Sequence, residues 1–349
     1  MLTHIEFENY RIFKKRQTLE IKPITILFGK NNAGKSAVLK LPSLIASINK
    51  SESRECFYTT YRNVKICESY RDLIYGKAAN AVFIKSSSDN NETEIMFHVD
   101  IDKPVFDKYE LHIINRDVHS YIDYIGPFRV EPNLDLRIEP QVLKRSGVKG
   151  ENAYQVLLRD MKTPTHSVCD KVSRWYQDNF EGWSVVVIDK QHPVYHIEME
   201  NNGFSIPIQD CGTGIIQSLP IVIRACQKAE EPTLVVLEEP ESHLNPAAHA
   251  ELCQLIVDST KEDENKKYLI ETHSHTFVLR IQRLLAERRI NVNNVALYYV
   301  KYDEDEKSSS LNRIEMKEDG RIPQWPEGLF EEEMEEILAI NNQRIRERK

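Results

Sequence analysis

One stretch constrains the fold of this chain more than any other: Gly29–Ser36, with the sequence GKNNAGKS. The apolar run 24–28 precedes it, and an apolar segment that begins at Ala37 follows it. This order of strand, glycine loop and helix start is the one that the Walker A pattern G-x-x-x-x-G-K-[ST] requires. The flanking segments favour a phosphate-binding loop over a chance match in an isolated glycine-rich turn.

The pattern predicts a role for each part of this loop. Its glycines let the backbone turn tightly, so that successive N–H groups converge on phosphate oxygens at the positive end of the next helix dipole. Lys35 is predicted to reach the β and γ phosphates of ATP, and the Ser36 hydroxyl to bind Mg²⁺. The predicted nucleotide-binding residues of the loop are Asn31, Asn32, Ala33, Gly34, Lys35, Ser36 and Ala37.

Composition sets the broad class of the protein. With 349 residues, 41% of them hydrophobic, the chain can bury a large core. Its apolar runs fall short of the roughly 18 residues of a membrane span, and the first residues lack a signal-peptide pattern, so we expect a cytoplasmic protein without membrane contact. The six cysteines include no C-x-x-C pair, which argues against a zinc site. The net charge of −8 gives no overall attraction to nucleic acid, although a local basic groove remains compatible with it.

A pair of carboxylates follows the apolar run 233–237. A buried strand that stops at acidic residues is typical of the Walker B motif, in which one carboxylate holds the metal and the next polarises the attacking water. We therefore predict that Glu238 has the metal-side role and that Glu239 is the general base. The alternative is a strand that ends in a solvated acidic turn.

A histidine ends the next predicted strand, 268–272. Ligands of parallel α/β sheets collect at the carboxyl ends of the strands, so His273 is predicted to hydrogen-bond a γ-phosphate. The role of His275 stays open, because a lone histidine is often structural.

Two glycines, Gly212 and Gly214, stand immediately before an apolar helical run. They resemble a helix N-terminus that is prepared for an anion. Pro220 lies inside that run, which predicts a helix that is kinked or starts late. Taken alone the motif is weak, because many loops contain two glycines at this spacing.

The remaining chain shows a β-rich first part and a helical section. Residues 5–10 and 18–21 alternate between apolar and polar, which predicts a hairpin whose basic turn places Arg11 near the nucleotide, or in solvent. Residues 81–125 indicate an antiparallel meander, and residues 151–180 are helical.

The order and spacing of these motifs resemble an ABC-type ATPase head, and within that group the stand-alone RecF/SMC/OLD-like AAA ATPases of bacteria. The opening residues 5–11 and the closing residues 320–328 also resemble the corresponding segments of this group. The resemblance implies an α/β fold: a two-lobed P-loop ATPase head with a mixed sheet, an antiparallel β-meander and a helical insertion. The expected parts are an N-terminal ATPase lobe (1–125), an inserted helical subdomain (126–183) and a C-terminal ATPase lobe (184–349).

The resemblance also implies a mechanism. In this group two heads enclose two ATP molecules, so a homodimer or higher homo-oligomer is expected. Gly212 and Gly214, with Gln217 nearby, would then face the γ-phosphate held by the partner's Walker A loop. Residues 242–246 would line the same interface as a D-loop, and His273 would be the switch histidine.

The chain departs from the ABC pattern at three places. Glu238 stands where aspartate is common, the signature differs from Leu-Ser-Gly-Gly-Gln, and no glutamine occurs around 70–76, where a Q-loop is expected. A Toprim nuclease domain and a long coiled coil, known from other members, have no counterpart in the sequence.

The resemblance implies a Mg²⁺-dependent ATPase that controls a separately encoded effector, such as a nuclease or toxin, in bacterial anti-phage defence. Two alternatives remain: a RecF/SMC-like ATPase of DNA repair or maintenance, with DNA as a partner, and a nucleotide-sensing scaffold with little turnover. A GTPase is disfavoured because an Asn-Lys-x-Asp motif is absent. The charged segment 331–349 is predicted to be a helix that is solvated or docks a partner.

Overall fold

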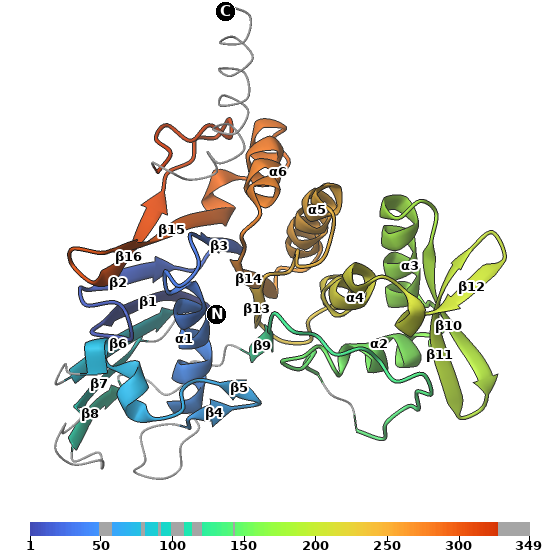
Figure 1. Ribbon diagram of the computed structural model, residues 1–349, viewed down its shortest axis with the longest axis horizontal. Helices are drawn as coiled ribbons and strands as arrows, with labels where there is room; N and C mark the ends of the chain where they lie inside the picture. The colour runs from blue at the N-terminus through green and yellow to red at the C-terminus, as the bar shows by residue number, and fades with distance from the viewer. Residues whose placement is uncertain are drawn as a thin grey trace, which may run out of the picture.

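The structure is a computed structural model that describes residues 1–48, 58–77, 81–89, 92–98, 108–113, 121–141 and 144–326 (Figure 1). The predicted C-terminal helix at 331–349 lies outside the described residues. Among those residues, no helix combines the length and apolar character needed to cross a membrane.

A six-stranded mixed sheet forms the centre of the molecule. Its strand order is β16 (Ser308–Ile314), β15 (Val295–Asp303), β3 (Ile24–Phe28), β14 (Lys266–Glu271), β13 (Thr233–Glu238) and β9 (Tyr121–Ile125). Neighbouring strands from β15 to β9 are parallel, and β16 is antiparallel to β15. The carboxyl ends of the three strands predicted to bear site residues therefore lie at one edge.

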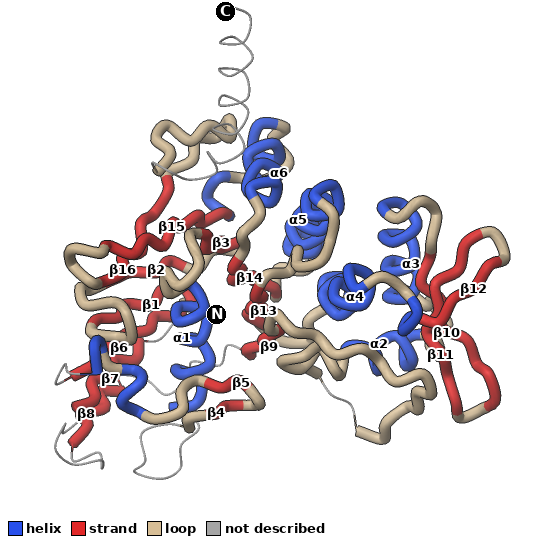
Figure 2. The backbone as a smooth tube through the Cα atoms, viewed as in Figure 1, coloured by secondary structure: helices blue, strands red, loops and turns tan. Residues whose placement is uncertain are grey.

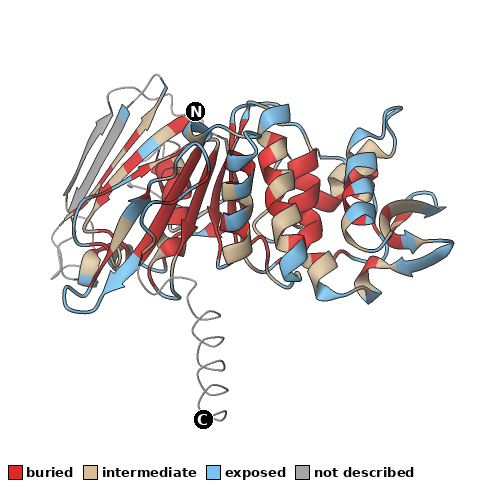
Figure 3. Ribbon diagram, turned by 90° about the horizontal axis from the view of Figure 1, so that it is seen from above, coloured by how far each residue is buried: buried red, intermediate tan, exposed pale blue. Residues whose placement is uncertain are grey.

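Alternate residues of the central strands face two separate hydrophobic clusters. Ile26 and Leu237 belong to the cluster that also contains the helices α4 (Thr213–Cys226), α5 (Pro246–Glu262) and α6 (His275–Ala286). Leu27 and Val236 belong to the other cluster, together with α1 (Lys35–Ile48). Because both faces are covered, the central strands are mostly apolar and appear almost entirely buried in Figure 3.

The second sheet packs on the α1 side of the central sheet. Its order is β2 (Gln17–Glu20), β1 (Leu2–Glu8), β6 (Ala81–Ser88), β7 (Glu92–His98) and β8 (Lys108–Ile113), with antiparallel pairs throughout. The predicted hairpin and meander are thus confirmed as far as β8. A short hairpin, β4 (Thr60–Tyr61) and β5 (Val64–Lys65), lies outside this sheet.

The prediction that residues 121–125 continue the meander is wrong. They form β9, the edge strand of the central sheet, parallel to β13. A short apolar run has the same appearance in either setting, and the choice depends on the distant partner strand.

The second lobe combines helices with a three-stranded sheet. The helices α2 (Ala153–Asp160) and α3 (Ser167–Asn179) pack with α4, and α3 also packs on the sheet of β10 (Ser184–Gln191), β11 (Val194–Asn201) and β12 (Phe204–Pro207) (Figures 1 and 2). The domain boundary expected at residue 183 stays a prediction. Short 3₁₀ turns at Tyr70–Leu73, Tyr75–Lys77, Ile208–Asp210 and Val292–Asn294 complete the described elements.

Candidate active site

The Walker A loop joins β3 directly to α1. Gly34 has a φ of 102°, and a Cβ atom there would lie 2.8 Å from the Ile12 side chain. Asn32 also has a positive φ, 62°, and its side chain is exposed together with that of Asn31. The loop is therefore packed against the turn that follows β1, while its tip, where the predicted phosphate contacts lie, stays open to solvent.

Lys35 is buried at the start of α1. Its Nζ donates to the backbone oxygens of Gly29 (3.0 Å) and Lys30 (2.9 Å) and lies 3.6 Å from a carboxylate oxygen of Glu271. Burial lowers the pKa of Lys35, and the Glu271 carboxylate opposes that change. The ammonium group thus lies across the loop, within reach of any anion that the loop binds.

Ser36, the predicted metal ligand, contacts an acidic residue that the sequence interpretation missed. Its hydroxyl donates to Glu271 Oε2 at 2.8 Å. Glu271 ends β14, between the Walker A strand and β13, where it is the register partner of both Leu27 and Glu238. The sequence feature that could have identified Glu271 is its position as the last carboxylate of a predicted strand, two residues before His273.

Glu238, the residue predicted for the metal side, has a different environment. It is buried, and one carboxylate oxygen accepts a hydrogen bond from the Tyr124 hydroxyl of β9. Burial raises the pKa of Glu238 to about 7, with a further increase from the adjacent Glu271 carboxylate. The structure therefore pairs Ser36 with Glu271 rather than with Glu238, whose predicted metal-side role stays a prediction.

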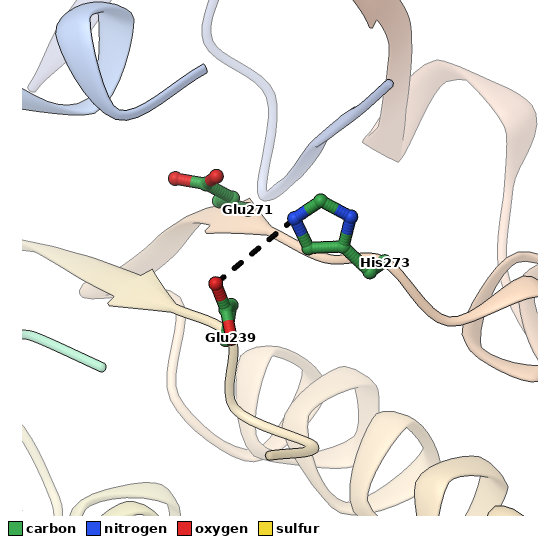
Figure 4. Close-up of side chains that lie close together, drawn as sticks. All are labelled: Glu239, Glu271 and His273. Atoms are coloured by element: carbon green, nitrogen blue, oxygen red, sulfur yellow. Dashed lines mark ion pairs between the residues drawn. The ribbon is translucent and has the colours of Figure 1, made fainter. Parts of the chain in front are cut away.

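Glu239 and His273 face each other beyond the strand ends. Glu239 Oε1 lies 4.0 Å from His273 Nε2, and Figure 4 shows the two side chains beside Glu271. One ligand atom from each of the three residues lies within 4.8 Å of the others. Burial and the charge of Lys35 lower the pKa of His273, which favours the neutral imidazole.

Glu241 fixes the strand end that bears the histidine. Its Oε1 accepts hydrogen bonds from the Thr272 hydroxyl (2.6 Å) and from the backbone N–H of His273 (2.8 Å). Glu241 is buried, so this bracing is shielded from water. The sequence interpretation gave Glu241 no role, although it lies two residues after Glu239.

The two glycines lie at the N-terminus of α4, but in different surroundings. Gly212 is the N-cap, is exposed, and has open space around an added Cβ. Gly214 lies against the loop after β13, where a Cβ would come within 2.5 Å of the His243 carbonyl oxygen. Helix α4 begins at Thr213 and continues through Pro220 to Cys226, so the late start is wrong.

Gln217, predicted to lie near a partner's phosphate, has intrachain partners for its side chain, and its predicted role stays a prediction. Its side-chain Oε1 accepts from the backbone N–H of Arg129 (2.9 Å), and its Nε2 donates to the Arg129 carbonyl (2.7 Å). Both ends of the amide are therefore used within the chain. Arg129 lies in the segment 126–129 after β9, which leads from the central sheet to the second lobe.

This segment, rather than residues 70–76, lies beside the Walker B strand. The 3₁₀ turns at 70–77 instead pack on the turn at Arg11, whose backbone N–H donates to the Leu73 carbonyl at 2.7 Å. The Q-loop expected near 70–76 stays a prediction.

Arg11 braces that turn. Its Nη2 donates to the backbone carbonyl of Ile66, and its Nε is buried. Arg11 thus has a structural contact, and its expected contact with the nucleotide stays a prediction. The positive φ of Arg11, 53°, belongs to the same tight turn.

Comparisons with known proteins agree with this architecture. No curated protein matches the sequence. Among solved structures, an SMC head bound to the C-winged helix domain of ScpA has a TM-score of 0.53 at 13% identity, with 90% of this chain and 98% of that chain covered. An Smc head with an extended coiled coil, bound to the C-terminal domain of ScpA from Pyrococcus furiosus, has a TM-score of 0.51 at 12% identity, with 97% and 99% covered.

These likenesses show the fold, that of an ABC-type, SMC-like P-loop ATPase head. Residues 290–340 match a family described as "Protein of unknown function (DUF3696)". Residues 87–280, more than half of the chain, match a second family. The chain therefore belongs to the family described as "AAA domain, putative AbiEii toxin, Type IV TA system".

Proposed function

We propose that this chain is a Mg²⁺-dependent ATPase that is active as an ATP-sandwiched dimer and controls a partner effector. The observation that supports the proposal best is the convergence of five side chains at the carboxyl edge of the central sheet. Lys35 and Ser36 come from the start of α1, Glu271 and His273 from the end of β14, and Glu239 from the end of β13.

The donor set fits a magnesium ion. Mg²⁺ prefers oxygen ligands and binds through few protein groups together with phosphate oxygens and water. The Ser36 hydroxyl and the buried Glu271 carboxylate, already 2.8 Å apart, are the residues that would hold it, with Glu238 next to them on β13. When bound, the ion neutralises negative charge on the phosphate oxygens.

The chain's own groups supply the remaining requirements of hydrolysis. Glu239 accepts a proton from water as the water oxygen forms a bond to the γ-phosphorus and the bond to the β–γ bridging oxygen breaks. ADP and inorganic phosphate are the products. Neutral His273 donates one hydrogen bond to a γ-phosphate oxygen, and Lys35 places its positive charge on the β and γ phosphates.

The N-terminus of α4 supports the dimer. Gly212 and Thr213 are exposed, so the first N–H groups of this helix and the positive end of its dipole are accessible. In an ATP sandwich this helix end, rather than the side chain of Gln217, faces the γ-phosphate bound by the second copy. ATP then links two copies only while its γ-phosphate is present, which couples hydrolysis to separation of the heads.

The partner effector is inferred from the family. Its description names a putative toxin of a type IV toxin–antitoxin system, and this supports a link to a separately encoded toxin or nuclease in anti-phage defence. The SMC heads with the same fold are observed with the protein ScpA, which agrees with a head that assembles with other chains.

Two variants test the proposal. Lys35→Ala should abolish ATP binding, whereas Glu239→Gln should bind ATP, lose hydrolysis and accumulate as a dimer in light scattering. Glu264→Gln makes the same charge change at an exposed site at the other end of the sheet and should behave like the wild type. A Glu239→Gln protein that stays monomeric with ATP would refute the sandwich.

The rate of ATP hydrolysis distinguishes this proposal from the two alternative functions. A wild-type protein that binds ATP but releases no phosphate is a nucleotide-sensing scaffold. Hydrolysis that rises with DNA and falls steeply with salt would instead favour a DNA-maintenance role.

A further inference from the structure

A buried arginine contacts the backbone around Glu239. Arg129 is buried, with 4% of its surface exposed, and its Nη2 donates to the carbonyl oxygens of Glu238 and, at 3.1 Å, of Glu239. The guanidinium therefore contacts the carbonyl oxygens of the two peptide groups that flank Glu239. Its position is fixed at the point where β13 ends and the predicted general base begins.

Glu239 needs such a contact because its backbone is unfavourable. Its φ is 43°, in the left-handed region that residues with a Cβ rarely adopt. The backbone N–H of Glu239 donates to the Glu271 carbonyl at 2.9 Å, so neighbouring groups hold both sides of the residue. This conformation aims the carboxylate toward His273, 4.0 Å away, as Figure 4 shows. Without external contacts, the backbone would relax and the carboxylate would turn away.

Arg129 is itself clasped by helix α4. The two hydrogen bonds between the Gln217 amide and the Arg129 backbone satisfy both the N–H and the C=O of that residue. Gln217 lies one turn after the glycines at the start of α4. A continuous chain of contacts thus runs from the helix through Gln217 and Arg129 to the backbone of Glu239.

Burial of the Arg129 guanidinium is energetically unfavourable if the side chain serves only for packing. Its Nε and Nη1 are buried and have no hydrogen-bond partner among the described residues. An apolar side chain of similar length would avoid the desolvation of those donors. Groups that are retained despite such a cost are concentrated at functional sites.

We propose that Arg129 is a positioning residue that couples helix α4 to the catalytic carboxylate Glu239. Movement of α4, which ATP-driven contact with a second copy would cause, is transmitted through Gln217 and Arg129 to the peptide that sets the Glu239 side chain. The inference rests on the proposed ATPase function. Under this inference, the position of α4 determines the orientation of the general base Glu239.

A matched control is available at the same junction. Arg224, also on α4, is 3% exposed, and its Nε donates to Asp123 of β9 at 2.7 Å. It therefore links the same helix to β9, the strand just before the segment that contains Arg129, through a buried arginine. Among the described residues, its hydrogen bonds do not reach the Walker B turn. Arg224→Lys and Arg129→Lys remove equivalent guanidinium groups and keep the charge.

The test compares steady-state ATP hydrolysis and ATP binding in Arg129→Met, Arg129→Lys and Arg224→Lys, each normalised to the folded fraction. We expect Arg129→Met to lower kcat about 10- to 100-fold with the Kd for ATP changed less than about threefold, since a small displacement of a reacting group has effects of this size. Arg129→Lys, which can donate to one of the carbonyls, should recover part of the loss. Arg224→Lys should keep kcat within about twofold of the wild type even if its Tm falls.

A second readout needs no turnover. In amide hydrogen exchange, the segment 236–241 should exchange faster in Arg129→Met than in Arg224→Lys, because only the former removes the Arg129 donor to the Glu238 and Glu239 carbonyls. The Glu239 carbonyl then keeps only its hydrogen bond from the Ser242 N–H, at 3.1 Å. Gln217→Ala, which leaves Arg129 in place, should show a smaller change in the same segment.

The outcomes separate this inference from the ATPase proposal. If the wild type hydrolyses no ATP, the proposed function fails and the coupling fails with it. If the wild type is active and Arg129→Met loses no more kcat than Arg224→Lys, or leaves exchange at 236–241 unchanged, the coupling role is overturned while the ATPase proposal stands.

Discussion

The hydroxyl of Ser36 donates a 2.8 Å hydrogen bond to the carboxylate of Glu271, the last residue of the strand next to the Walker A strand. This contact joins the start of α1 to the strand end that continues into His273. The neighbouring carboxylate, Glu238, accepts instead from Tyr124 on its other side. Two buried carboxylates at the same level of the sheet therefore have different partners. We expect their removal to affect the magnesium dependence of ATP hydrolysis to different extents.

Glu271→Gln should weaken the magnesium dependence of ATP hydrolysis more than Glu238→Gln. Removing the carboxylate beside Ser36 should raise the Mg²⁺ concentration for half-maximal activity about 10-fold or more, because the group lost is charged and buried. The measurement is phosphate release at fixed ATP over a Mg²⁺ titration. If Glu238→Gln gives the larger change, the metal-side role returns to Glu238, as the sequence motif alone suggested.

Glu238 should make the nucleotide-free protein less stable at alkaline than at acidic pH. Burial raises its folded pKa from 4.5 to about 7, so the folded state binds more protons than the unfolded state between these values. Stability from this group is thus fully present below pH 4.5 and is lost as the pH rises through about 7, at a cost on the order of 3 kcal/mol.

Thermal unfolding of Glu238→Gln checks this sign. In EDTA and without nucleotide, the variant should have a higher Tm than the wild type at pH 8 and a similar one at pH 5. A variant that is less stable than the wild type at pH 8 would show that the ionised carboxylate is favourably paired in the folded state.

The sequence predicted the strand ends of this site because each is marked locally. A buried apolar run followed by a glycine loop, by two carboxylates or by a histidine is visible in a few residues, and parallel pairing brings the ends together. Glu271 was missed because a carboxylate inside Glu-Thr-His gives no sign that its side chain faces α1. Its role follows from the strand order, with β14 between β3 and β13, which the sequence does not contain.

Arg129 and β9 were missed for a related reason. The segment 121–125 has the length and apolar character of a meander strand, and only its parallel partner, β13, places it in the central sheet. If residues 121–125 are assigned to the meander, the sequence gives no reason to place the segment 126–129 beside the Walker B turn. The role assigned to Gln217 came from the group as a whole, whereas its side-chain bonds depend on that same misplaced segment.

Glu241 should support catalysis through His273, the proposed switch histidine. Glu241→Ala removes the acceptor of both the Thr272 hydroxyl and the His273 N–H, which frees the strand end. We expect kcat to fall about tenfold with little change in the Kd for ATP, because the histidine is displaced rather than removed. Glu241→Gln retains an acceptor oxygen and should lose less. Equal losses in the two variants would mean that the negative charge, rather than the bracing, is required.

The two signature glycines should respond differently to a single methyl group. Gly214→Ala places a Cβ 2.5 Å from the His243 carbonyl, and that contact must open at a cost of about 1–3 kcal/mol, so the Tm of the nucleotide-free monomer should fall. Gly212→Ala meets open space at an extended backbone position and should leave that Tm nearly unchanged. In the proposed ATP sandwich, however, the exposed Gly212 position would face the second copy. Gly212→Ala in the Glu239→Gln background should therefore weaken ATP-dependent dimerisation in light scattering while the monomer stays intact. A Gly212→Ala protein that dimerises as tightly as its parent would place this helix end outside the interface.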